Sequence, residues 1–209
     1  MTGRPAVFLD RDGTVTEPRH YPTRPQDLVL QEGVGEALRE LHLRGWALVI
    51  VTNQSGLARG LFPMQSLDSM HRHLRTLLAE YGVVLDAIYA CPHHVDGAVD
   101  GLSFRCGCRK PQPGLLLWAA EELGLDLTAS WMVGDFASDV EAGLRAGCRT
   151  AWVGRSWLEP LAGLAEPAGP VESAGPARPA GTAGEQGPVP TLRTATTAEA
   201  LRHIVLSRP

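Results

Sequence analysis

Two aspartates lie two positions apart just after a short apolar run near the start of the chain. The run is "AVFL" (6–9), and Asp10 and Asp12 follow it, with Gly13 and Thr14 next. In extended geometry, side chains two positions apart point the same way, so both carboxylates are expected to face one point. Close carboxylates repel each other unless one is protonated or a cation lies between them. A hard cation such as Mg²⁺ takes oxygen ligands, so the pair predicts a magnesium site.

Polar residues end two further apolar runs. Thr52 and Asn53 follow "WALVIV" and offer a hydroxyl, an amide and free backbone N–H groups, which suit an anion before a helix. Asp135 ends "SWMVGD" and would complete the carboxylate set around the cation. Asp139 could either orient that set or cap the helix that follows, and both roles stay open.

A single lysine stands out among the basic residues. Of the 19 lysines and arginines, only Lys110 is a lysine. A planar guanidinium does not reproduce its compact ammonium group. Lys110 precedes "PQPG", and we expect it to neutralise phosphate charge without transferring a proton.

The stretch "CPHHVDGAVDGLSFRCGCRK" (91–110) holds three of the four cysteines. Cys91-x-His93 and Cys106-x-Cys108 offer four ligands from two short loops, which suit tetrahedral Zn²⁺. A site saturated by three cysteines and one histidine has no open position, so it would be structural. A redox pair of Cys106 with Cys108 stays open as the alternative. Cys148 is expected to be a small buried hydrophobe.

Strand and helix patterns alternate through the part of the chain that carries these residues. Doubly wound parallel α/β sheets have this alternation, and their chemistry lies just past the carboxyl ends of strands. Asp10, Thr52 and Asp135 fall at such ends. The expected strands are 6–10, 46–54, 85–91, 130–135 and 150–154, and the expected helices are 33–45, 64–82, 113–124 and 137–147.

Composition divides the chain into three parts. Residues 1–155 form the predicted catalytic core, with the Cys-rich loop at 91–108. Residues 156–190 are rich in Ala, Gly and Pro with few large apolar side chains, which predicts a flexible linker or insertion. Within 191–209, Thr196 and Glu199 fit a capping box. A last strand and helix packed on the core are expected there, with a frayed tail as the alternative.

Charge and hydropathy exclude some classes of protein. The formal net charge of −4 argues against a broad nucleic-acid surface. The longest strongly apolar run, "WALVIV", is far shorter than the roughly 20 residues that span a membrane. The N-terminal residues lack the apolar region of a signal peptide. We therefore expect a cytoplasmic protein that binds neither membrane nor nucleic acid. A monomer is the expected oligomeric state, although nothing in the charge or hydropathy decides it.

Four motifs together resemble those of the haloacid-dehalogenase (HAD) phosphatase superfamily. D-R-D-G-T, T-N-Q-S-G, R-K-P-Q-P-G and G-D-x-x-x-D occur in that order within about residues 5–155. "FLDRDGT", "TNQSGLARG" and "CPHH…CGCRKPQPG" are more closely similar to the heptose-bisphosphate phosphatase family, which shares a zinc loop with the histidinol-phosphate phosphatases. The resemblance implies a Rossmann-like HAD fold. No long insertion separates the motifs, so a minimal cap is expected.

The resemblance also implies a division of roles. Asp10 would attack phosphorus, and Asp12 would act as general acid and then as general base. Mg²⁺ would be held by the side chains of Asp10 and Asp135 and by the backbone carbonyl of Asp12. Thr52, Asn53 and Lys110 would brace the phosphoryl group. The implied substrate-binding residues are Arg11, Pro18, Arg19, His20, Tyr21, Asn53, Gln54, Ser55 and Arg109.

For the Cys-rich loop, the resemblance selects His93 over His94, so the implied zinc ligands are Cys91, His93, Cys106 and Cys108. His94 is then expected at the surface or beside the ligands. One position departs from the family: Phe136 stands where lysine is frequent. A substrate contact is therefore either missing or supplied from elsewhere.

The implied reaction removes the 7-phosphate of a heptose 1,7-bisphosphate, a step of nucleotide-activated heptose biosynthesis, with the anomer left open. A histidinol-phosphate phosphatase is the alternative; "TNQSGLARG" and the long gap between Cys91 and Cys106 favour the heptose enzymes. The acidic charge disfavours a polynucleotide 3′-phosphatase. A non-catalytic zinc module would have no reason to keep Asp10, Asp12, Lys110 and Asp135 together.

Overall fold

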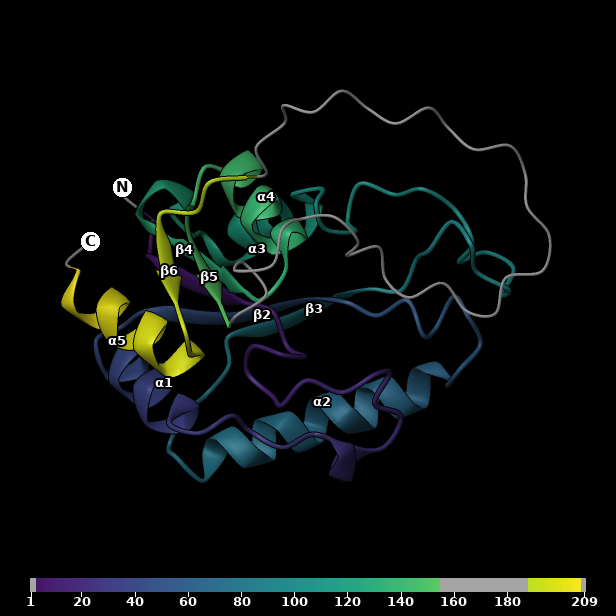
Figure 1. The fold of residues 1–209 in the computed structure, drawn as a ribbon, viewed down its shortest axis with the longest axis horizontal. Coiled ribbons are helices and arrows are strands. Elements are labelled where there is room, and N and C mark those ends of the chain that lie inside the picture. Colours follow the sequence, from purple (N-terminus) through teal and green to yellow (C-terminus); the bar gives the residue numbers. More distant parts are fainter. Residues whose placement is uncertain (1–2, 155–187, 208–209) are drawn as a thin grey trace.

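The computed structural model describes residues 3–154 and 188–207, which form a parallel sheet covered by helices on both faces (Figure 1). The strand order is β3-β2-β1-β4-β5-β6, and every pairing is parallel. The predicted doubly wound α/β class is confirmed. The strands are β1 (Ala6–Leu9), β2 (Ala47–Asn53), β3 (Ala87–Cys91), β4 (Trp131–Gly134), β5 (Arg149–Val153) and β6 (Leu192–Thr194).

Alternate residues of each strand supply two separate apolar layers. Val7 and Leu9 face the layer with α1, α2 and α5, whereas Ala6 and Phe8 face the layer with α3 and α4. Parallel strands covered on both faces read as continuous apolar runs, as "AVFL" and "ALVIV" do. The helices are α1 (Val34–Leu43), α2 (Met64–Ala79), α3 (Gly114–Leu123), α4 (Ala137–Ala146) and α5 (Thr197–Leu206), with 3₁₀ turns η1 (Pro25–Asp27) and η2 (Leu127–Ala129).

Helix ends agree with the sequence expectations to within a few residues. Gly124 and Gly147 follow α3 and α4 at φ of 64° and 87°, the left-handed conformation that ends helices and that glycine adopts without strain. Between β1 and α1 the described chain holds only a loop with η1, and between β3 and α3 only the Cys-rich loop. The described core thus has the predicted minimal cap.

The C-terminal segment completes one side of the sheet. β6 pairs with β5, and α5 buries Ala200, Leu201 and Ile204 in the layer that contains α1. The expected capping box begins α5: the Thr196 hydroxyl accepts a hydrogen bond from Glu199 N at 3.2 Å. The predicted linker, 156–190, lies outside the described residues as far as residue 187.

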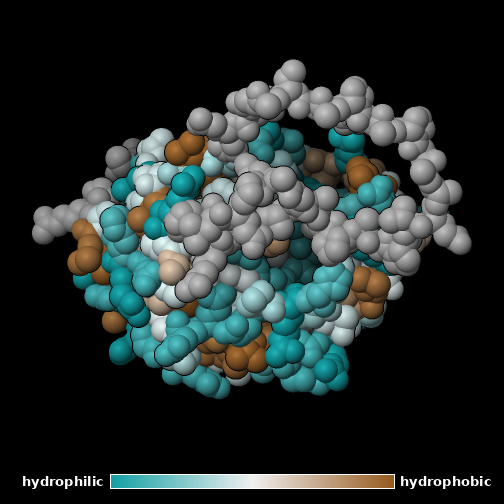
Figure 2. Space-filling view, viewed as in Figure 1, coloured by the Kyte–Doolittle hydropathy of each residue, from teal (hydrophilic) through white to brown (hydrophobic). Residues whose placement is uncertain are grey.

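The surface contrasts with these apolar layers. On the face seen in Figure 2, hydrophilic residues predominate and apolar residues gather in small separate patches. No helix in the ranges 3–154 and 188–207 is long and apolar enough to cross a membrane.

Candidate active site

The chemistry-bearing residues meet where the strand order reverses. From β1 the strand order runs through β2 to β3 on one side, and from β4 it runs through β5 to β6 on the other. The order therefore reverses between the neighbouring strands β1 and β4. Ligands bind at such switch points, outside the carboxyl ends of the strands. Asp10 follows β1 and donates its backbone N–H to Val133 of β4 at 3.0 Å. Asp135 directly follows β4, so both aspartates lie at the same edge.

Three carboxylates and one ammonium group form the centre of the site. One oxygen from each of Asp10, Asp135 and Asp139 lies within 4.8 Å of the others. Lys110, only 3% exposed, donates to Asp10 Oδ1 at 2.6 Å and to the Val51 carbonyl at 2.8 Å, and its Nζ lies 2.6 Å from Asp139 Oδ1. These three partners match the three donors of an ammonium group. The lysine is thus held in one position.

The electrostatics show an excess of negative charge in this cluster. Burial raises the pKa of Asp10 from 3.8 to about 6, opposed by Lys110 and reinforced by Asp139. Burial, followed by Asp10 and Asp139, also raises the pKa of Asp135. Burial alone would lower the pKa of Lys110, but Asp10 and Asp139 outweigh it and the pKa is raised. Three carboxylates against one cation therefore fit a bound divalent cation.

Asp139 has the capping role that the sequence left open, and it also has a contact with Lys110 that the sequence did not indicate. Its Oδ2 accepts a hydrogen bond from Phe136 N at 3.0 Å and so caps α4, while its Oδ1 faces Lys110. Asp139 thus orients the lysine as well as the helix. Phe136 itself is 47% exposed and presents an apolar ring next to Asp135.

Gly13 allows the loop after β1 to approach Asp135. Its φ is +82°, and a Cβ placed there would lie 2.2 Å from Asp135 Oδ2. Any other residue would be strained and would clash with the carboxylate. Thr14 donates its hydroxyl to Asp135 Oδ1 at 3.3 Å. The D-G-T part of the motif therefore shapes the cation site.

Asp12 takes different partners from Asp10. Arg11 Nε donates to Asp12 Oδ1 at 3.0 Å and Arg11 Nη2 to Asp12 Oδ2 at 2.7 Å. Gln54 Nε2 donates to Asp12 Oδ2 at 3.0 Å and to Thr52 Oγ1 at 2.9 Å. The Asp12 side chain is therefore outside the carboxylate cluster, and the ends of β1 and β2 are tied together through it.

Of the implied substrate-binding residues, several are brought to the same edge and three are exposed in the loop after β1. Asn53 exchanges two hydrogen bonds of 3.1 Å with the backbone of Lys110. The Tyr21 hydroxyl lies 3.5 Å from Ser55 Oγ. Arg109 is half-buried, whereas Pro18, Arg19 and His20 are exposed. Arg11 and Gln54 are buried.

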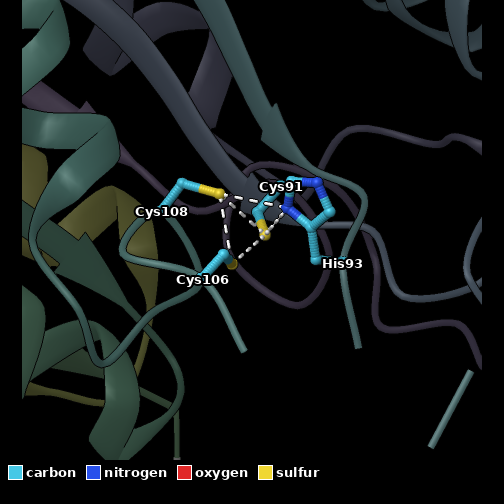
Figure 3. A group of neighbouring side chains, drawn as sticks. All are labelled: Cys91, His93, Cys106 and Cys108. Atoms are coloured by element: carbon cyan, nitrogen blue, oxygen red, sulfur yellow. Dashed lines mark hydrogen bonds between the residues drawn. The ribbon is translucent and has the colours of Figure 1, made fainter. Parts of the chain in front are cut away.

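The four predicted ligands of the Cys-rich loop converge on one point (Figure 3). The sulfurs of Cys91, Cys106 and Cys108 lie 3.2–3.5 Å apart, and His93 Nδ1 lies 3.6 Å from Cys91 and 3.3 Å from Cys108. A tetrahedral site with metal–sulfur bonds of about 2.3 Å has edges only slightly longer than these. The donor set therefore could hold a metal ion.

His94 lies apart from that cluster. Its Nε2 is 3.3 Å from Arg59 Nη2, and its Nδ1 accepts the backbone N–H of Asp96 at 3.1 Å. All four cysteines are free thiols in the structure. The Cys106–Cys108 sulfur separation of 3.3 Å exceeds the roughly 2 Å of a disulfide bond.

Sequence reasoning missed two partnerships. The contact between Lys110 and Asp139 joins separate motifs, and the G-D-x-x-x-D spacing marked Asp139 without indicating its partner. No sequence pattern indicated the buried Arg11–Asp12–Gln54 network. Residue type alone does not distinguish an exposed arginine in a turn from a buried arginine that pairs with a carboxylate.

Comparison with known proteins agrees with the fold and the site. A family model described as HAD-hydrolase-like matches residues 107–168. A Yersinia pestis protein named D-glycero-beta-D-manno-heptose-1,7-bisphosphate 7-phosphatase is 49% identical over 146 residues, which cover 70% of this chain and 78% of the relative. The protein of the same name from Escherichia coli strain K12 is 44% identical over 146 residues, or 70% and 76% of the two chains.

Two solved structures are also similar. One is D,D-heptose 1,7-bisphosphate phosphatase from B. bronchiseptica, complexed with magnesium and phosphate, at 31% identity and a TM-score of 0.75, covering 97% of this chain and 98% of that one. The other is a HAD-like phosphatase of Mesorhizobium loti, at 39% identity and a TM-score of 0.70, covering 73% and 74%.

The switch-point carboxylates and the parallel sheet define a HAD-like hydrolase, an enzyme of the phosphoric monoester hydrolase class. Within that class, the chain belongs to the family of the D-glycero-beta-D-manno-heptose-1,7-bisphosphate 7-phosphatases.

Proposed function

We propose that this enzyme removes the 7-phosphate of D-glycero-β-D-manno-heptose 1,7-bisphosphate, with Mg²⁺ as its cofactor. The observation that carries the proposal is the buried Asp10–Lys110–Asp139 cluster at the switch point. It occurs in a chain that is 49% identical to a relative bearing the name of this activity. Histidinol phosphate remains the second candidate substrate.

The first half of the reaction transfers the phosphoryl group to Asp10. A carboxylate oxygen of Asp10 forms a bond to phosphorus while the bond from phosphorus to the sugar oxygen breaks. Asp12 gives its proton to that leaving oxygen, so the product leaves as an alcohol. Asp10, Asp135 and the Asp12 backbone carbonyl would hold Mg²⁺, which would supply positive charge that offsets the negative charge of the phosphoryl group.

The second half releases phosphate. Asp12, now ionised, accepts a proton from a water molecule whose oxygen bonds to phosphorus, and the bond between phosphorus and Asp10 breaks. Lys110 contributes its fixed ammonium charge, and Thr52 and Asn53 contribute hydrogen-bond donors at the same edge. Because Asp139 and Val51 hold Lys110 in place beforehand, little reorganisation is needed during the reaction.

We further propose that Cys91, His93, Cys106 and Cys108 hold a structural zinc ion. Three thiolates and one imidazole suit Zn²⁺ and leave no position for substrate. Cys108 lies two residues before Lys110, and Gly114 N donates to the Gly107 carbonyl at 3.0 Å. The metal would therefore fix the chain segment that delivers the lysine.

Removing this metal is expected to lower stability and activity together. Cys106→Ser should reduce the zinc content, the melting temperature and kcat, since the metal contributes to folding free energy. Metal analysis, thermal unfolding and phosphate release measure the three effects. Cys148→Ala is the control, because Cys148 lies outside the cluster in an apolar layer, and it should leave the zinc content unchanged. Activity lost at an unchanged melting temperature would instead indicate a catalytic zinc.

Phosphate release across a substrate panel tests the proposed activity. The panel holds the α and β anomers of heptose 1,7-bisphosphate, histidinol phosphate and a 3′-phosphorylated oligonucleotide. The β anomer is expected to give the highest kcat/KM, by about tenfold or more over histidinol phosphate, a difference of about 1.4 kcal/mol in transition-state binding. A preference for histidinol phosphate or the oligonucleotide would refute the assignment. The monomeric state and cytoplasmic location stay predictions.

A further inference from the structure

We propose that Arg11 is a positioning residue: its buried guanidinium orients Asp12 so that Oδ1, and not Oδ2, carries the proton exchanged with the leaving group. The proposal rests on the general acid–base role of Asp12 in the proposed function. It replaces the substrate contact that family resemblance implies for Arg11.

The first support is the geometry of the pair. Arg11 Nε and Nη2 donate one hydrogen bond to each carboxylate oxygen, at 3.0 and 2.7 Å. This two-bond arrangement sets the plane of the carboxylate as well as its distance. The Arg11 side chain is fully buried while that of Asp12 is 24% exposed. The arginine thus reaches the carboxylate from the protein interior, and the carboxylate remains open toward substrate.

The second support is a count of lone pairs. Each carboxylate oxygen has two acceptor sites. Asp12 Oδ2 accepts from Arg11 Nη2 and from Gln54 Nε2, so both of its sites are used. Oδ1 accepts only from Arg11 Nε among the described residues, so one of its sites stays available. The proton that passes to the leaving oxygen, and later returns from water, is therefore assigned to Oδ1.

The loop and the neighbouring strand hold this arrangement in place. The Arg11 carbonyl accepts hydrogen bonds from the backbone N–H groups of Val15 and Thr16 and from the Thr16 hydroxyl, at 3.0, 2.9 and 3.1 Å. Gln54 Oε1 accepts from Arg11 Nη2 at 3.1 Å, and Gln54 Nε2 also donates to Thr52 Oγ1. Both the backbone and the side chain of Arg11 are therefore constrained.

His71 of α2 adds no positive charge beside the guanidinium. Burial, and then the charge of Arg11, lower the pKa of His71 to about 4, opposed by Asp12. The imidazole is therefore neutral near pH 7. A direct substrate contact by Arg11 would require the guanidinium to leave both Asp12 oxygens and its buried position, which is unfavourable because it breaks the ion pair.

The test uses leaving-group dependence, because general acid catalysis matters most when the leaving oxygen is strongly basic. The probes are p-nitrophenyl phosphate, phenyl phosphate, an alkyl phosphate and heptose 1,7-bisphosphate. kcat/KM reports on steps up to the first irreversible one, here transfer to Asp10. Arg11→Lys is expected to lower kcat/KM on the order of 100-fold for the alkyl and sugar phosphates, and no more than roughly fivefold for p-nitrophenyl phosphate.

Arg4→Lys is the matched control. Arg4 also pairs with an aspartate, Asp86, at 2.6 Å, but at the opposite end of β1. Any loss of kcat/KM that this variant shows relative to wild type should be the same for all four probes. Similar losses of Arg11→Lys on all four probes would overturn the positioning role, because a general structural defect or a lost phosphate contact would affect every substrate.

A double-mutant comparison checks that Arg11 acts through Asp12. In an Asp12→Ala background, Arg11→Lys should cause little further loss with the sugar phosphate. Additive losses would refute the proposal. Gln54→Leu provides a second variant that keeps Arg11: it should show a smaller loss in the same leaving-group order, with thermal unfolding confirming that it folds.

Failure of this inference differs from failure of the proposed function. If the wild-type enzyme hydrolyses the aryl and alkyl phosphates but not the heptose substrate, the substrate assignment is refuted. The loss caused by Arg11→Lys can still be compared between the alkyl and aryl phosphates. A wild-type enzyme inactive on every phosphate monoester would overturn both.

Discussion

Replacing Asp10 by asparagine is expected to abolish phosphate release, lowering kcat by roughly 10⁴-fold or more, as removal of a covalent nucleophile does. The amide has nearly the shape of the carboxylate and can still accept from Lys110 Nζ, which lies 2.6 Å from Oδ1. It cannot, however, form the bond to phosphorus. Phosphate release and trapping of the phosphorylated enzyme measure the loss.

The same variant is expected to keep or increase its stability. The folded-state pKa of Asp10, about 6, lies above its usual 3.8. The folded state therefore binds the proton more tightly than the unfolded state, and the carboxylate lowers stability as the pH rises from about 4 through 6. Asparagine removes this loss, so without added magnesium the advantage of the variant in melting temperature should grow over that interval. The Asp10 carboxylate thus lowers stability but is required for activity.

Asp68→Asn is the matched control for Asp10→Asn. Asp68 is an exposed residue of α2, and its replacement makes the same chemical change outside the site. It should leave both kcat and melting temperature nearly unchanged. Normal turnover by Asp10→Asn would show that Asp10 is not the nucleophile.

Replacing Lys110 is expected to damage both activity and folding. Lys110→Met leaves Asp10 and Asp139 buried without their shared cation, and breaking a buried ion pair costs about 3–5 kcal/mol of unfolding free energy. It also removes a fixed charge beside the phosphoryl group, for which a loss of kcat on the order of 10²–10³-fold is expected. Denaturant unfolding and phosphate release give the two values.

Lys110→Arg tests whether positive charge alone is sufficient. The three acceptors of Lys110 surround one nitrogen at 2.6, 2.6 and 2.8 Å in a pocket nearly closed to solvent. A planar guanidinium spreads its donors over three nitrogens and cannot reproduce this arrangement. We therefore expect most of the activity loss of Lys110→Met to persist in Lys110→Arg.

Arg44→Lys is the control for the Lys110→Arg exchange. Arg44 pairs with Glu40 on the surface of α1 at 3.2 Å, and exposed pairs contribute only about 0–1 kcal/mol. Its activity should be close to wild type. Near-normal rates for Lys110→Arg would show that the single lysine among the basic residues is a coincidence of composition.

Much of the fold follows from local pattern. "AVFL" and "ALVIV" are short and continuously apolar, and "ALVIV" is also rich in β-branched residues, so each predicts a buried parallel strand. Glycine at 124 and 147 marks helix ends because it adopts positive φ without strain. The exact bounds of the helices could not be predicted from the sequence. The helix expected at 33–45 is observed as Val34–Leu43, because helix ends depend on capping partners.

What the sequence determined by itself was the set of groups that could do chemistry: two aspartates after a strand, a single lysine, and three cysteines with a histidine. Residue type and spacing carry that information, because ionisation, ligand preference and strand geometry are local properties. Only the tertiary structure decided which groups meet. Asp10 and Lys110 are 100 positions apart, and Asp10 lies beside Asp135 because β1 pairs with β4 in the register Leu9↔Val133. The burial of Arg11 beneath Asp12 was likewise decided by packing, since burial depends on which distant segments cover a residue.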